Sequence, residues 1–289
     1  MISVVIPSFF SSGLLEERIK EINNSFEIII IENSRDFNLK KNLETKYKNV
    51  KVVIPDKNIG YPAAFNLGIS LSINQYIFLT QPDVKLIDNC LEKLSELVRK
   101  FDDFTIITPY DIGNKDYSNY EIYKNYPKLK KNDYLLEQVD LVDLTWLINK
   151  RNFNENDFFD ENFFLYFEAY DFARRLIKKN KKVFITKKIN TFHIGSSSHD
   201  KNLQHYATLT RCWHYNWSKF YYFKKHFGYF FAFKKSLGIL FKLMIKISNN
   251  SIFYNKRNLV YLVAELRGLL SSMFNLPSKY RPYEKVSKN

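Results

Sequence analysis

The sequence predicts an α/β fold in which a mostly parallel central sheet carries helices on both faces. Three observations support this prediction. Short runs of aliphatic and β-branched residues alternate with longer helical patterns through the first 110 positions. These runs are apolar at nearly every position, which is typical of strands buried on both faces. Polar residues follow several of the runs directly. Strands separated by helices in this way form βαβ units and therefore a parallel sheet.

Each element has its own signal in the sequence. The first strand is rich in β-branched residues and ends at a proline, the second is broken by Glu32-Asn33-Ser34, and the third is followed by a Pro/Asn/Gly loop. The helices show mixed charges or amphipathic spacing. Strands are expected at 2–7, 26–31, 50–54, 76–79 and 104–108, and helices at 14–24, 37–48, 62–73 and 86–101. A second block, 139–190, mixes short strands with one helix.

Composition narrows the class of protein. The 289 residues, 45% of them hydrophobic, are enough for one large domain or two small ones. Two cysteines, Cys90 and Cys212, exclude a disulfide scaffold and a four-cysteine zinc site. The first residues lack the features of a signal peptide, and no uncharged apolar run approaches the ~20 residues of a spanning helix. We therefore expect a cytoplasmic protein whose membrane contact, if any, is peripheral.

The positive charge is concentrated at one end of the chain. Residues 211–289 contain 15 Lys/Arg and 2 Glu, so they carry +13 of the net charge of +14. Residues 227–247 interleave aromatic and aliphatic residues with lysines, and helical spacing brings Lys235, Lys242 and Lys246 near one face. This pattern predicts an interfacial helix on an anionic membrane. The alternative is a helical pair, with a second helix at 257–274, that packs on the preceding domain or forms a homodimer. No nucleic-acid-binding motif is present, so nucleic acid is not an expected partner.

The strand ends carry the first candidate site residues. Ligands bind at the carboxyl ends of strands in such sheets. Those ends hold Pro7, then Glu32 with Asn33, then Gln81 and Asp83. A carboxylate at a strand end can hold a divalent cation that bridges a diphosphate, although most Pro-Asp pairs are simple turns. Neither a dinucleotide-binding glycine motif nor a P-loop is present.

A loop with small residues and amides joins the third strand to a helix. It contains Asn58, Gly60 and Asn66, whose amides and small neighbours allow a ligand to approach the start of the helix. A loop that only caps the helix would have the same sequence pattern.

Two further stretches contain ionisable residues. Glu168 and Asp171 lie three positions apart among aromatic residues, so they share one face if a helix begins here. A carboxylate among aromatic rings can have a raised pKa and act as a general base, but acids are also favoured in any first helical turn. His193 comes after a strand-like run at 183–186 and begins the loop His-Ile-Gly-Ser-Ser, which suits phosphate or metal contact. A lone histidine is as often structural.

Taken in order, these motifs resemble the family 2 glycosyltransferases of the GT-A fold. They are Val-Val-Ile-Pro-Ser-Phe, Ile-Glu-Asn-Ser, Asn-Ile-Gly-Tyr-Pro-Ala-Ala-Phe-Asn-Leu-Gly, Gln-Pro-Asp-Val, Phe-Asp-Glu-Asn-Phe-Phe-Leu-Tyr-Phe-Glu-x-x-Asp and His-x-Gly-x-Ser. Within that family the chain is similar to the bacterial rhamnosyl- and galactofuranosyltransferase-like enzymes of surface polysaccharide synthesis. The resemblance spans roughly residues 2–225.

The resemblance implies an inverting transfer of a sugar from a UDP- or dTDP-sugar to a hydroxyl of a glycan or lipid-linked acceptor. Pro7 and Glu32 match positions that line the nucleotide base and ribose, and Asn58, Gly60 and Asn66 match the loop packed on the nucleotide-sugar. It also implies a nucleotide-binding half at 1–110, an acceptor-binding half at 111–210 and a basic helical region at 211–289.

The resemblance further implies a divalent cation, Mn²⁺ or Mg²⁺. Asp83 matches the last acid of the family's Asp-x-Asp metal motif, whose first acid is here Gln81. His193 matches a histidine that contacts diphosphate or metal. Because Gln81 is uncharged, a strict metal requirement is less expected than in the family at large.

The main departure from the family is Ala169, which occupies the position of the usual catalytic aspartate. Three interpretations follow. Glu168 acts as the base, Asp171 acts as the base, or the protein is a catalytically degenerate partner subunit.

Overall fold

The computed structural model describes residues 1–113, 118–122, 134–143, 145–154, 157–195, 203–252 and 256–285. The chain forms two compact units, one of Met1–Phe159 with Ala169–His199 and one of Asp160–Glu168 with Asp200–Asn289. The second unit thus takes a short acidic segment from the middle of the chain, in addition to the predicted C-terminal helical region.

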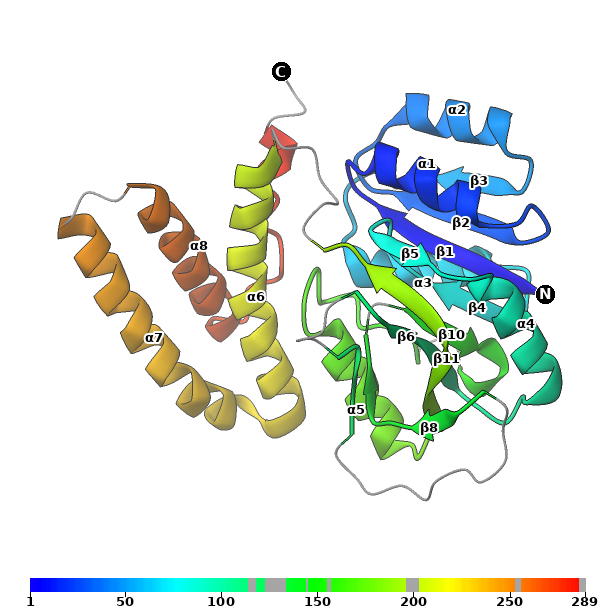
Figure 1. The fold of residues 1–289 in the computed structure, drawn as a ribbon. Helices are drawn as coiled ribbons and strands as arrows, with labels where there is room; N and C mark the ends of the chain where they lie inside the picture. The colour runs from blue at the N-terminus through cyan, green and yellow to red at the C-terminus, as the bar shows by residue number, and fades with distance from the viewer. Residues whose placement is uncertain are drawn as a thin grey trace. The chain divides into compact units, whose positions relative to one another are not determined.

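A mixed sheet forms the centre of the first unit (Figure 1). Its order is β3-β2-β1-β4-β10-β6-β11-β5, with β8 paired to β11, and β7 with β9 forms a separate ribbon. The strands are β1 (Ile2–Ser8), β2 (Glu27–Glu32), β3 (Val50–Val53), β4 (Tyr76–Leu79), β5 (Val84–Leu86), β6 (Ile106–Asp111), β7 (Tyr120–Glu121), β8 (Leu136–Gln138), β9 (Leu141–Val142), β10 (Trp146–Asn149) and β11 (Val183–His193).

Strand direction brings six carboxyl ends to one edge of this sheet. β1 pairs in parallel with β2 and β4, and β2 with β3. β10 is antiparallel to both β4 and β6, so β4 and β6 run the same way, and β11 is parallel to β6. The carboxyl ends of β1, β2, β3, β4, β6 and β11 therefore share an edge, which confirms the predicted mostly parallel sheet.

Helices cover both faces of the sheet because alternate strand residues point to opposite sides. Val4 belongs to a core cluster that includes Leu15, Leu43 and Leu94, whereas Val5 belongs to one with Phe65 and Phe172. The first cluster is covered by α1 (Ser12–Glu21), α2 (Phe37–Lys46) and α4 (Cys90–Lys100), and the second by α3 (Tyr61–Leu71) and α5 (Glu168–Lys178); the short helix η1 is Lys150–Asn152.

Several boundaries differ from those expected from the sequence, and three of the differences lie near Asp83, Asp111 and His193. β6 continues past 108 to Asp111, because Pro109 lies beyond the last residue pair with β10 and its missing N–H costs no bond there. β11 continues past 186 to His193 through a register shift between Thr186 and Asn190. The short strand β5 precedes α4, which begins at Cys90 rather than at 86.

The second unit is built on α6 (Gln204–Phe227), α7 (Tyr229–Ile252) and α8 (Lys256–Met273), followed by the short helix η3 (Pro282–Lys285). Each of the three long helices contributes to a common core, through Phe220 of α6, Leu243 of α7 and Leu269 of α8. Gly268 lies against the backbone of Trp213, where a Cβ atom would fall 2.0 Å from the carbonyl oxygen. Only glycine therefore permits this approach of α8 to α6. None of the described helices is both long and apolar enough to cross a membrane.

Candidate active site

Polar side chains gather where the parallel strands of the first unit end. β1 ends at Ser8 beside Glu32, the last residue of β2, and the two form a residue pair in the sheet. β4 leads through Gln81 to Asp83, and β11 ends at His193. The strand ends that the sequence predicted to carry the chemistry thus lie along one edge.

Asp83 and His193 are in direct contact. The two residues adjoin the paired strands β5 and β11, in which His193 is opposite Val84. The backbone N–H of Ile194 donates to the Asp83 carbonyl at 2.9 Å, and Nε2 of His193 lies 3.4 Å from Oδ2 of Asp83. The side-chain interaction with Asp83, together with its charge and those of Asp111 and Asp143, raises the pKa of His193 against the effect of burial. The partly buried imidazole of His193 therefore lies in a negatively charged environment.

Asp111 is a buried carboxylate that the sequence analysis did not identify. Its Oδ1 accepts hydrogen bonds from the backbone N–H groups of His193 at 2.8 Å and of Gly113 at 3.2 Å. A Cβ atom on Gly113 would fall 2.6 Å from the His193 carbonyl oxygen, so only glycine fits there. Oδ2 of Asp111 is buried and has no hydrogen-bond partner among the described residues. Asp111 thus fixes the backbone that presents the His193 ring.

The signal for Asp111 in the sequence was weak. It follows Thr-Pro-Tyr, and Pro109 suggested that the strand had already ended. Buried Asn119 supports this turn, since its Nδ2 donates to the Pro109 carbonyl at 2.8 Å and its Oδ1 accepts from the Asp111 N–H at 3.2 Å. The sequence could have predicted Asp111 only if the strand had been extended through the proline.

The end of β2 is tied to the loop before α3. Oδ1 of Asn33 accepts from the Ile59 N–H at 3.2 Å, and Oδ1 of Asn58 accepts from the Gly60 N–H at 3.0 Å. Gly60 has φ 86°, a conformation that favours glycine, and it caps α3. Three predicted site residues therefore form one connected turn.

Glu32 and Pro7 lie beside this turn in the buried ends of their strands. Oε1 of Glu32 accepts from the backbone N–H of Ser34 at 2.7 Å and from the Ser34 hydroxyl. Oε2 is buried and has no hydrogen-bond partner among the described residues. Pro7 pairs with Ile31 in the sheet. One oxygen of this buried carboxylate is thus left without a hydrogen-bond donor among the described residues.

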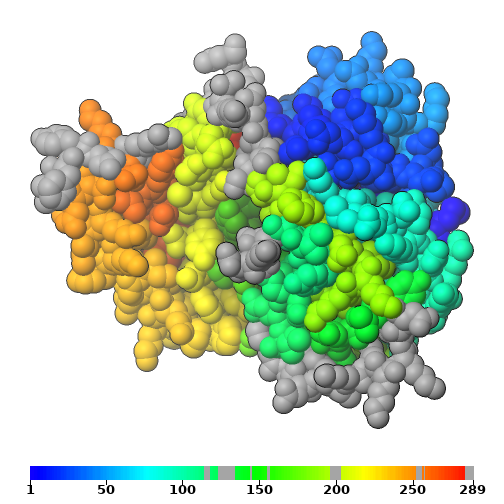
Figure 2. All heavy atoms as spheres, in the orientation of Figure 1, coloured from blue at the N-terminus to red at the C-terminus, as the bar shows by residue number. Residues whose placement is uncertain are grey.

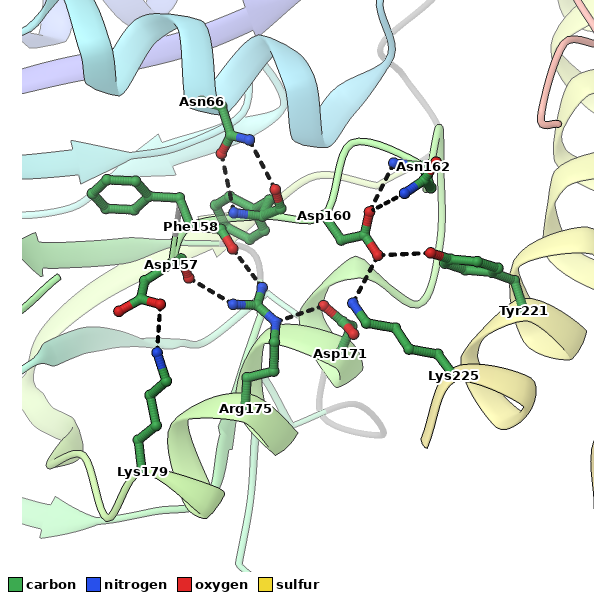
Figure 3. Close-up of polar contacts among 11 residues, drawn as sticks. Asn66, Asp157, Phe158, Asp160, Asn162, Asp171, Arg175, Lys179, Tyr221 and Lys225 are labelled. Carbon is green, nitrogen blue, oxygen red and sulfur yellow. Dashed lines mark hydrogen bonds and ion pairs between the residues drawn. The ribbon is translucent and has the colours of Figure 1, made fainter. Parts of the chain in front are cut away.

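Asn66 is placed by α3 against the segment that precedes the acidic stretch (Figure 3). Its Nδ2 donates to the Phe159 carbonyl at 2.8 Å, and its Oδ1 accepts from the Phe159 N–H at 3.0 Å. The amide thus satisfies both the N–H and the carbonyl group of Phe159. This is a structural role, whereas the sequence predicted a contact with the nucleotide-sugar.

Asp171 has a buried side chain that is engaged by Arg175 one helical turn later. Nε of Arg175 lies 2.9 Å from Oδ2 of Asp171 (Figure 3). The same guanidinium donates to the carbonyl oxygens of Asp157 and Phe158. The ion pair therefore holds α5 against the preceding loop of the first unit.

Glu168 is the buried first residue of α5 and the last residue of the acidic segment in the second unit. The two residues before it, Tyr166 and Phe167, have φ of 69° and 65°. Two successive non-glycine residues with positive φ are uncommon, and such strain is concentrated at functional sites. Ala169, at the position of the family's usual base, is buried.

Side chains of α6 hold the acidic segment inside the second unit. The Ser218 hydroxyl donates to the Leu165 carbonyl at 2.8 Å. The Tyr221 hydroxyl at 3.0 Å and the Lys225 ammonium at 2.7 Å both donate to Oδ2 of Asp160 (Figure 3). Burial is the largest single effect and would raise the pKa of Asp160, but the hydrogen bond and charge of Lys225 together with the hydrogen bonds from Asn162 outweigh it and lower the pKa. Asp160 is thus a structural anion of this segment.

The metal-ligating atoms of Asp83 and His193 fit a divalent cation that is also coordinated by a bound ligand. Among the described residues, no group of three or more His, Cys, Asp or Glu side chains is arranged to hold a metal alone. One carboxylate and one imidazole supply too few ligands for a protein-only site. Mg²⁺ and Mn²⁺ are commonly completed by substrate phosphates and water, so the pair fits a cation bound together with a diphosphate. Ser196 to His199, at the end of the predicted histidine loop, lie outside the described residues.

Comparisons with known proteins agree with this geometry. The chain is similar in structure to GalNAc-T7 with UDP, GalNAc and Mn²⁺, at a TM-score of 0.55 and 17% identity over 78% of this chain and 51% of that one. It is also similar to the mannosyltransferase PcManGT from Pyrobaculum calidifontis in complex with GDP-Man and Mn²⁺, at a TM-score of 0.55 and 8% identity over 95% and 87% of the two chains. At these identities the likeness shows the shared GT-A fold. The chain spans about half the length of GalNAc-T7.

Sequence comparison gives the family. No curated protein matches the chain. The profile described as Glycosyl transferase family 2 matches residues 3–158, which is more than half of the chain and includes β1 to β4, Asp83 and Asp111. The chain therefore belongs to glycosyl transferase family 2.

Proposed function

We propose that the protein is an inverting glycosyltransferase that moves a sugar from a nucleotide-diphosphate donor to a hydroxyl group of a glycan or lipid-linked saccharide. The observation that carries this proposal is the contact between Asp83 and His193 at the carboxyl edge of a family 2 sheet. A carboxylate and an imidazole at such an edge suit the diphosphate end of a donor.

The nucleoside end of the donor is assigned to the turn built by β2 and the loop before α3. Pro7, Glu32 and Asn33 are proposed to line the base and ribose, with Asn58 and Gly60 in the adjoining loop. This assignment is supported by the Glu32 carboxylate, whose Oε2 has no hydrogen-bond partner among the described residues and can accept from a ribose hydroxyl. UDP and dTDP are the proposed nucleotides, and rhamnose, galactofuranose or a hexose the proposed sugar.

A divalent cation, Mn²⁺ or Mg²⁺, is proposed to be held by Asp83 and His193 together with the donor's diphosphate. When bound, it would neutralise the negative charge that develops on the leaving diphosphate. Gln81, which adds no charge beside Asp83, is proposed to contact the donor through its amide. The proposal is supported by the structures of GalNAc-T7 with UDP, GalNAc and Mn²⁺ and of PcManGT with GDP-Man and Mn²⁺.

Glu168 is the proposed general base. The acceptor hydroxyl oxygen attacks the anomeric carbon, its proton passes to the Glu168 carboxylate, and the bond from the anomeric carbon to the diphosphate oxygen breaks. Attack from the face opposite the leaving group inverts the configuration. The choice of Glu168 over Asp171 is supported by the ion pair that occupies Asp171 and by the strained backbone that precedes Glu168.

The biological setting is proposed to be the synthesis of a cell-envelope polysaccharide in the cytoplasm, at the inner face of the membrane. The basic charge of residues 211–289 supports a peripheral association with anionic lipid, where a lipid-linked acceptor would be located.

Thermal unfolding with nucleotides tests the donor proposal. The protein is heated with UDP, dTDP, GDP or CMP, each with and without Mn²⁺ or Mg²⁺. A ligand that binds only the folded state stabilises it by ~2.7 kcal/mol at 100 times its dissociation constant. We expect one diphosphate to raise the melting temperature, and to do so more strongly with the metal. If none raises it, and no nucleotide-sugar is hydrolysed above blank, the degenerate-partner interpretation replaces this proposal.

A further inference from the structure

We infer that α7 lies in the interface of an anionic membrane, with its outward apolar face among the acyl chains and its lysines at the headgroups. This inference rests on the proposed peripheral association and names the surface that makes it. It does not depend on the sugar-transfer chemistry.

One side of α7 is used by the fold of the second unit. Ala232, Ser236 and Leu243 are buried, and the first and last of these belong to the same core as Phe220 of α6 and Leu269 of α8. The spacing of these positions follows one face of a helix. This face is therefore fully occupied and cannot bind a further partner.

The opposite side of α7 is exposed and mostly apolar, with Lys234 as the charged residue among its apolar side chains. Phe230 is 87% exposed and Phe241 67% exposed, and their other neighbours on this face are also large and apolar. Figure 2 shows α7 (yellow-orange) running along the surface of its unit. We call these residues the outer face of α7; they are Phe230, Phe233, Leu237, Phe241, Met244 and Ile245.

The outer face is long and continuous. From Phe230 to Met244 its members recur at intervals of three or four residues, and Ile245 adjoins Met244, so they form a stripe rather than scattered exposed side chains. From Phe230 to Ile245 the helix rises by about 22 Å at 1.5 Å per residue. Contiguous exposed apolar surface of this kind marks an interaction site, whereas single exposed apolar residues do not.

The charge next to this face identifies the partner as anionic. Lys235, Lys242 and Lys246 follow one another at spacings of seven and four residues, which places them along one flank of the stripe, and α7 contains no acidic residue. Long lysine side chains extend to a headgroup region while the neighbouring apolar groups are buried below it.

A second copy of the chain is the competing partner, and the charge argues against it. Pairing two outer faces about a twofold axis would bring identical lysine-bearing helices together, within regions that each carry +13. Like charges at such an interface oppose association, whereas anionic headgroups neutralise them. A lipid surface therefore satisfies both the apolar face and its charged flank.

Vesicle flotation with the full chain tests this inference. The double variant Phe230→Glu/Phe241→Glu is compared with the wild type on vesicles of phosphatidylcholine mixed with phosphatidylglycerol. Ile73→Glu is the matched control, because Ile73 is 82% exposed and lies in the first unit. Circular dichroism and nucleotide-dependent stabilisation establish that each variant is folded. We expect the double variant to lose at least ten-fold in vesicle partitioning and the control to bind like the wild type.

A lysine variant separates charge from apolar contact. Replacing Lys235, Lys242 and Lys246 by Ala should lower partitioning by on the order of 100-fold at low salt, since each lysine near an anionic surface contributes about 1 kcal/mol. High salt should weaken the wild type in the same way.

Three results would overturn the inference. They are wild-type protein that remains unbound to the mixed vesicles, equal binding to phosphatidylcholine alone, and light scattering that reports a dimer which the double variant converts to a monomer. Each concerns lipid or self-association, so none would by itself remove the proposed transferase function, which the nucleotide experiment decides.

Discussion

The side-chain amide of Asn66 forms two hydrogen bonds with the backbone of Phe159, one to its carbonyl oxygen and one from its N–H. The two residues are far apart in sequence, and this pair anchors the chain immediately before it leaves the first unit for the acidic segment. Phe159 also stacks on Phe65, so the anchor joins a polar and an apolar contact on α3.

Replacing Asn66 by Ala should therefore destabilise the first unit. Both Phe159 backbone groups lose this partner, and an unsatisfied buried group costs about 1–3 kcal/mol. Urea unfolding measures the loss. Asn42→Ala, on the exposed surface of α2, is the control and should change stability by no more than about 0.5 kcal/mol. An Asn66 variant with normal stability but no nucleotide-dependent stabilisation would instead identify Asn66 as a donor contact.

Asp83→Ala should abolish turnover and remove the metal-dependent part of the stabilisation by nucleotide. The reason is that the Asp83 carboxylate is the charged oxygen ligand beside His193. Stability without ligand should fall only modestly, which denaturation checks separately. A near-normal rate in this variant would exclude the proposed metal role.

Glu168→Gln should lower kcat by at least ~100-fold, the usual lower bound for loss of a general base, while nucleotide binding remains. Asp171→Asn should act differently. It breaks a buried ion pair with Arg175, so it should lower the free energy of unfolding by about 3 kcal/mol. If Asp171→Asn were as stable as the wild type but inactive, and Glu168→Gln active, the roles of the two acids would have to be exchanged.

The free energy of unfolding should decrease as the pH is lowered, because of His214. Burial, aided by the charge of Arg281, lowers the pKa of His214 to about 3, well below its ordinary value of 6.5. The unfolded chain therefore takes up a proton first, and the stability contributed by neutral His214 is full above pH 6.5 and lost as pH falls toward 3. The expected slope is about 1.4 kcal/mol per pH unit within that window.

Urea unfolding followed by tryptophan fluorescence at pH 7 and pH 5 measures this slope, since Trp213 and Trp217 lie on the same helix as His214. His214→Gln removes the titrating group and should flatten the difference. Equal pH dependence in the variant and the wild type would rule out His214 as its source.

The sequence predicted β1 to β4 well because each of these strands is a largely apolar run with its own terminator. The strand at 76–79 agrees in both bounds, and the helix expected at 62–73 is α3. Prediction was poorer where tertiary contacts override the local signal. Pro109 sits inside β6 because β10 stops short of it, and a register shift carries β11 on to His193.

The candidate site was predicted in part for the same reason. Glu32, Asp83 and His193 follow recognisable strand ends, and the structure brings the last two into contact. Asp111 was not among the predicted site residues because its strand continues through a proline. The engagement of Asp171 by Arg175 and of Asn66 by Phe159 depends on which helix face meets which loop, and periodicity alone does not specify that choice.

The acidic segment 160–168 belongs to the same compact unit as the helices from residue 200 onward. Exchange of this unit between relatives therefore needs three junctions, before residues 160, 169 and 200, rather than one. A chimera joined only near residue 200 would carry one parent's segment into the other parent's helices, and Asp160 would no longer meet its native Lys225 and Tyr221. A hybrid that keeps its folding intact has to inherit residues 160–168 and 200–289 from the same parent.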